Sequence, residues 1–106
     1  MKIEEGTIKE VGYALDNKYE SPLLRLVIKG EDGWYSSLDF TRDVHSKIFS
    51  LANDSSLILL LGLRVYMLSY PGEGLKKAPI AISDRSSGWI YKKEYDQNGN
   101  RLEEKE

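Results

Sequence analysis

The alternation of apolar and polar residues predicts a chain built mainly of β-strands. The clearest case is residues 23–29 (LLRLVIK), where apolar residues at alternate positions face one side and basic residues face the other. Residues 34–40 (WYSSLDF) follow the sequence GEDG, whose Asp-Gly pair is a strong signal for a hairpin turn. Two antiparallel strands, each with one apolar face, are therefore expected between residues 23 and 40.

Further strands are predicted on both sides of this hairpin. Residues 7–13 (TIKEVGY) and 78–83 (APIAIS) each predict a short strand, and residues 89–95 (WIYKKEY) predict a last one. Residues 57–70 (LILLLGLRVYMLSY) predict a long strand, in which Gly62 marks a bulge or a sharp bend. The odd-numbered side of this long strand is rich in leucine, and we expect it to face the core.

A single helix is predicted between the third and fourth strands. Thr41 and Asp43 are suitable N-caps for a helix over residues 44–52, whose apolar residues have amphipathic spacing. The elements then follow the order strand, strand, strand, helix, strand, strand, with a final strand or hairpin after residue 83. Such an order predicts a barrel or a sandwich.

Length and composition indicate one small globular domain. The chain has 106 residues, of which 41% are hydrophobic and 30% charged, and it contains no cysteine. We expect residues 1–95 to form this domain and residues 96–106 to form a flexible acidic tail. The absence of disulfides favours a reducing cytoplasm. The acidic start of the chain (MKIEE) does not suit a signal peptide, and the apolar run 57–63 is too short to span a membrane.

The element order over roughly residues 6–83 resembles that of the OB-fold superfamily, in which the helix also lies between the third and fourth strands. This resemblance implies a mainly β fold with one helix, namely an OB-fold-like five-stranded, partly open barrel. The strand after residue 83 is then a C-terminal hairpin extension. The resemblance also implies that ligands lie across the second and third strands, between the loops at residues 14–22 and 71–77.

Aromatic residues interleaved with basic ones supply the candidate chemistry. Proteins that bind single strands need cations for the phosphates and flat rings on which bases stack. The chain has seven tyrosines and two tryptophans, several of them close to lysine or arginine. The candidate nucleic-acid-binding residues are Lys18, Tyr19, Arg25, Lys29, Tyr35, Arg64, Tyr66, Lys76, Lys77, Trp89, Tyr91 and Lys93. They predict a protein that binds single-stranded nucleic acid, and DNA is the ligand we expect. The lone, compact OB-like chain suggests an accessory protein in replication or recombination of a phage or mobile element.

A protein-interaction module is the alternative function. The formal net charge of -2 excludes a bulk polycation effect on nucleic acid. Tyrosine and tryptophan also cover cores in ordinary strands, and both are enriched among the residues that anchor protein interfaces. A replication protein or a second copy of the chain is the partner under this interpretation.

Catalysis is not expected, and neither is a metal or another cofactor. His45 is the only histidine, and without cysteine it does not build a typical zinc site. Residues 96–100 (DQNGN) offer oxygen ligands but lack the downstream glutamate of a calcium loop. Glu73 between two glycines would repel a phosphate, and no serine lies in a Gly-x-Ser-x-Gly sequence.

Overall fold

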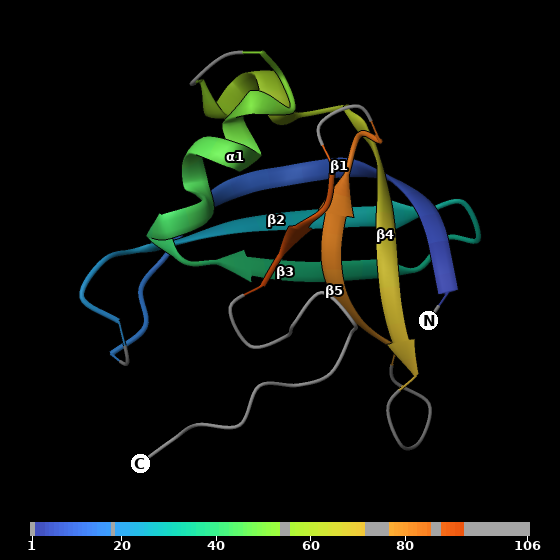
Figure 1. Ribbon diagram of the computed structural model, residues 1–106, viewed down its shortest axis with the longest axis horizontal. Coiled ribbons are helices and arrows are strands. Elements are labelled where there is room, and N and C mark those ends of the chain that lie inside the picture. Colours follow the sequence, from blue (N-terminus) through green and yellow to red (C-terminus); the bar gives the residue numbers. More distant parts are fainter. Residues whose placement is uncertain (1, 18, 54–55, 72–76, 86–87, 93–106) are drawn as a thin grey trace.

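The computed structural model describes residues 2–17, 19–53, 56–71, 77–85 and 88–92. Within these ranges the chain forms six β-strands and one short α-helix, which confirms a mainly β fold with one helix (Figure 1). The strands are β1 (Lys2–Ala14), β2 (Leu23–Gly30), β3 (Tyr35–Phe40), β4 (Arg64–Pro71), β5 (Lys77–Ser83) and β6 (Ile90–Tyr91). The helix α1 (His45–Ser50) lies between the 3₁₀ helices η1 (Arg42–Val44) and η2 (Leu57–Leu60).

All six strands belong to one antiparallel sheet in the order β3-β2-β1-β4-β5-β6. The long strand β1 pairs with β4 along its first half and with β2 over most of its length. A register shift between Ile8 and Glu10 interrupts the β1–β2 ladder, and such irregularities increase strand twist and bending. The sheet is accordingly curved, and β4 and β5 run at a steep angle to β2 and β3 (Figure 1).

The sheet is not closed into the expected barrel. Strands β3 and β5 approach each other, but no backbone pairing joins them within the described ranges. On its edge away from β4, β5 pairs with β6 through Ala81 opposite Tyr91 and Ile82 opposite Ile90. At Ala81 and Ile82, the edge of β5 that β3 would need for closure is therefore occupied by β6.

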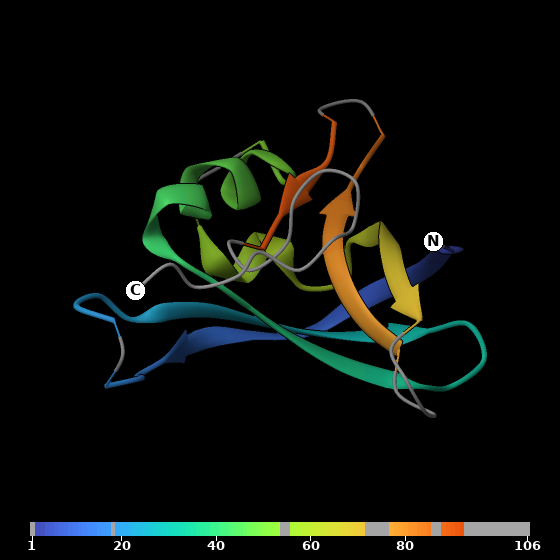
Figure 2. The ribbon, with the colours of Figure 1, turned by 60° about the horizontal axis from the view of Figure 1, so that its bottom comes forward.

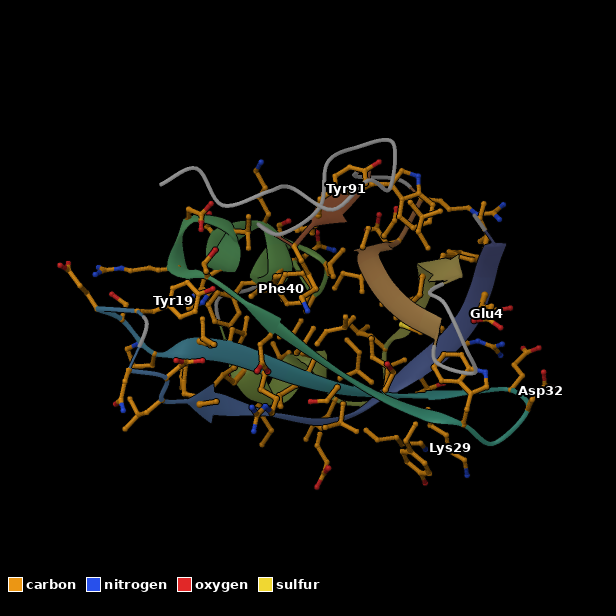
Figure 3. All side chains as sticks on the ribbon, turned by 90° about the horizontal axis from the view of Figure 1, so that it is seen from below. Glu4, Tyr19, Lys29, Asp32, Phe40 and Tyr91 are labelled. Carbon is orange, nitrogen blue, oxygen red and sulfur yellow. The ribbon has the colours of Figure 1, made fainter. Side chains whose placement is uncertain are left out.

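The core lies between the concave side of the sheet and α1 (Figure 2). Leu24, Leu26 and Ile28 on β2 are fully buried, as the alternation in the sequence predicts. Phe40 points into the same interior from the end of β3 (Figure 3). Ile48 is the buried residue of α1. Each such side chain contributes about 1.5–3 kcal/mol through removal from water, and this burial fixes which faces of the strands point outward.

The segment before β4 differs from the predicted long strand. Residues 57–60 form η2, in which Leu60 is fully buried while Ile58 is 70% exposed. Gly62 has a φ of +84°, and its N–H donates a hydrogen bond of 2.8 Å to the carbonyl of Ile8. Since this positive φ suits glycine, Gly62 ends a turn that precedes β4 instead of marking a bulge within a strand. The odd-numbered face predicted for the core exists only from Val65 onward.

Candidate functional site

The outward face of β2 and β3 carries three cross-strand pairs. The register places Lys29 opposite Tyr35, Val27 opposite Ser37, and Arg25 opposite Asp39. The Tyr35 ring is 62% exposed, and the Lys29 ammonium lies 5.6 Å from its centroid. Lys29 points away from the interior in Figure 3. This end of the hairpin thus presents an exposed ring beside a cation, which is the combination that single-strand binding requires.

The other end of the same face is electrically balanced. Arg25 donates from Nε and Nη2 to the two carboxylate oxygens of Asp39, at 2.8 and 2.9 Å. These hydrogen bonds, and the negative charge behind them, raise the pKa of Arg25 above its usual value. The side chains of Arg25 and Asp39 are 50% and 28% exposed, so that solvent reaches both partners of this pair.

On β4, Arg64 is held by carboxylates from two other segments. Its Nη2 lies 2.9 Å from Glu5 of β1 and 2.7 Å from Glu31 in the β2–β3 turn. The side chain therefore links three parts of the sheet, and its charge is already compensated. Arg64 was predicted to contact nucleic acid, and the structure gives it this structural role.

The guanidinium of Arg85, which was not among the predicted site residues, covers the Tyr66 ring. The guanidinium carbon of Arg85 lies 4.1 Å from the centroid of the Tyr66 ring, at cation–π distance. Arg85 has a φ of +68°, and its N–H donates a hydrogen bond of 2.8 Å to the buried hydroxyl of Ser83. The sequence indicates a turn at this position, but the stacking depends on the antiparallel pairing of Tyr66 with Ser83.

Trp89 and Tyr91 belong to a second, small apolar cluster. Both are partly buried and pack on Leu68 and Ala81, which lie opposite each other on β4 and β5. Figure 3 places Tyr91 on the far side of the molecule from Lys29. The predicted rings are therefore not gathered on one surface, and Tyr35 is the one with both an exposed ring and a lysine beside it among those described.

Two adjoining hollows lie where the β1–β2 loop meets the segment after β3. The first, about 280 Å³, is lined by Tyr19, Glu20, Ser21, Leu23, Thr41, Arg42 and Asp43. The second, about 240 Å³, is lined by Tyr13, Ser21, Pro22, Arg42 and His45. In Figure 3 Tyr19 lies beside the segment that leaves β3. Of the predicted site residues, Tyr19 thus lines the first of these hollows.

Hydrogen bonds and one ring contact position the polar side chains around these hollows. Thr41 was predicted as an N-cap, but its hydroxyl donates to the Asp43 carboxylate and makes no cap bond. His45 Nε2 lies 2.9 Å from the Phe40 carbonyl. Because a carbonyl only accepts, Nε2 carries the proton in this contact. The His45 ring also lies 6.1 Å, centroid to centroid, from that of Tyr13.

Some predicted site residues lie outside the ranges that the structure describes. Lys18, Lys76 and Lys93 fall beyond the described residues, and Lys77 is described only as the first residue of β5. In the described part of the chain, no three histidine, aspartate or glutamate side chains gather into a group able to hold a metal ion. No helix there has the length and apolar character of a membrane span.

Comparisons with protein families, with curated protein sequences and with solved structures return no match to this chain.

Proposed function

We propose that the chain is an OB-type domain that binds single-stranded nucleic acid across the outward face of β2 and β3, and we take this nucleic acid to be DNA. Its biological role is that of an accessory protein in replication or recombination, and no catalytic step is assigned to it. The topology supports this proposal, because α1 lies between β3 and β4, and β1 lies between β2 and β4 in the sheet. An OB-fold is a partly open barrel that binds oligonucleotides on this face.

The observation that carries the proposal is the exposed Tyr35 ring beside Lys29. A ring at this position offers a face for one base, which is worth about 1–3 kcal/mol per stacked base. The ammonium beside it neutralises a neighbouring phosphate. Arg25 adds a second cation on the same face, where a phosphate replaces Asp39 as its partner.

A titration of fluorescein-labelled oligo(dT) with the protein at low salt tests the proposal. We expect micromolar or tighter binding, and a loss of roughly tenfold for Tyr35→Ala, which removes the stacking surface. Lys29→Gln is expected to weaken binding less. Lys47→Gln, which removes an exposed lysine from α1, serves as the charge control and is expected to bind as the parent does. A flat titration of the parent protein at low salt would reject the proposal.

A protein-interaction module is the second candidate, and the structure contributes one observation in its favour. Ile58, Leu59 and Leu61 are 70%, 47% and 45% exposed in and after η2. Exposed apolar side chains that lie together are typical of contact surfaces between proteins. These residues differ from the predicted tyrosine and tryptophan anchors. Light scattering at rising protein concentration tests self-association: a dimer that Leu59→Ser dissociates supports this candidate, and a monomer throughout counts against it.

A further inference from the structure

The two hollows beside the β1–β2 loop share an arginine that forms no ion pair within the described residues. Arg25, Arg64 and Arg85 are each held by a carboxylate or by the Tyr66 ring. Arg42 lines both hollows, is exposed, and forms no ion pair with any carboxylate of the described residues. A guanidinium in this position offers several N–H donors in a fixed geometry that matches a phosphate.

The second hollow has the chemistry of an anion site. Its lining consists of Tyr13, Ser21, Pro22, Arg42 and His45 and includes no acid. Arg42 supplies positive charge, and Ser21 supplies a hydroxyl that donates to an oxygen. His45 is fixed by its hydrogen bond to the backbone, so that its ring forms a wall of defined orientation. The hollow has a volume of about 240 Å³, which is large enough for a phosphate group beside Arg42 and Ser21.

The first hollow suits the base of the same nucleotide. Tyr19 and Leu23 supply apolar surface, and a tyrosine ring stacks on any base. Glu20 and Asp43 would repel a phosphate, but carboxylates accept hydrogen bonds from the N–H groups at a base edge. The two hollows share Arg42 as a lining residue, so a phosphate and its base occupy adjoining spaces.

We infer that these hollows form one subsite for the phosphorylated end of a nucleic-acid strand, with the terminal phosphate on Arg42 and the terminal base on Tyr19. The inference rests on the proposed function, because the subsite continues the proposed path. Leu23, which lines the first hollow, begins β2, and Arg25 lies two residues further along the strand. A strand that passes Tyr35 and Arg25 therefore ends at Arg42.

Three versions of one short single strand that differ only at their ends test the inference. One carries a 5′-phosphate, one a 3′-phosphate, and one has hydroxyls at both ends; each competes with a labelled strand for the full chain. We expect one phosphorylated version to bind roughly tenfold more tightly than the hydroxyl version, since bonds between charged groups are the stronger class. Arg42→Gln removes this preference, so that the phosphorylated and hydroxyl versions bind the variant with equal affinity. Lys9→Gln, an exposed lysine of β1, keeps the preference.

The outcomes separate the subsite from the proposed function. Equal affinity for all three strands, or a preference that survives Arg42→Gln, overturns the subsite. If the hydroxyl version still binds and Tyr35→Ala still weakens it, the proposed function stands without the subsite. If no version binds at low salt, both fail. Melting temperatures of Arg42→Gln and the parent show whether the variant is folded, and we expect them to agree because Arg42 is exposed.

Discussion

Under the proposed function, Asp39 competes with nucleic acid for Arg25. Its two oxygens accept both hydrogen bonds that the guanidinium donates on this face. Asp39→Asn removes the negative charge and frees Arg25 for a phosphate, and we expect oligo(dT) to bind roughly two- to fivefold more tightly. Asp32→Asn makes the same charge change in the exposed β2–β3 turn and is expected to have a smaller effect. Equal effects of the two variants in the titration would show that net charge alone governs binding.

The Trp34 ring lies so close to Gly30 that it leaves no room for a side chain at this position. A Cβ at this position would overlap the Trp34 indole, which packs against the core. Gly30→Ala therefore forces the ring to move, and we expect it to lower the free energy of unfolding by about 1–3 kcal/mol. A Cβ at Gly12 meets nothing within 4 Å, so Gly12→Ala is expected to be neutral or slightly stabilising. Urea denaturation of both variants measures the difference, and equal stabilities would contradict this reason.

The sequence predicts which face of a strand a site residue lies on, but not which side chains contact it. Alternation placed Arg25, Lys29 and Tyr35 on the outward face, because the leucines between them have to be buried. The alternation does not indicate which side chains from other segments contact an outward-facing residue. The carboxylates beside Arg64 and the guanidinium above Tyr66 come from segments far along the chain. Their proximity depends on which strands pair and in which register, and a local pattern does not encode either.

At the scale of elements, Leu60 is the buried residue of η2, and Leu57 packs beside it against the core. Leu60 is fully buried in the core, whereas its neighbour Ile58 is 70% exposed. We expect Leu60→Ala to lower the free energy of unfolding by about 2–5 kcal/mol, since it removes buried methyl groups and leaves a cavity. Ile58→Ala is expected to change it by less than about 0.5 kcal/mol. If residues 57–60 formed the predicted strand, burial would instead follow the odd-numbered positions, and Leu59→Ala would be the costly variant.

Element order was predictable and element boundaries were less so. The strands on both sides of the β2–β3 turn follow from alternation and from the Asp-Gly signal. The run LILLLGL is apolar at every position, so its periodicity cannot distinguish a strand from a tight helical turn. Barrel closure was expected from the OB resemblance, and it depends on which strand occupies the free edge of β5. At Ala81 and Ile82 that edge is taken by β6, which lies within the strand predicted over residues 89–95, but the local pattern does not indicate which strand β6 pairs with.

At the scale of the whole molecule, the near-neutral charge means that the salt dependence of binding reports individual phosphate contacts. With a formal net charge of -2, the chain has no general attraction for nucleic acid, so each lost contact should be visible in the slope of log affinity against log salt. A phosphate neutralised on a single strand contributes about 0.7 to this slope. We expect Lys29→Gln to reduce the slope by about that amount, and Asp39→Asn to increase it as Arg25 gains a phosphate. Unchanged slopes in both variants would place the bound strand away from β2 and β3.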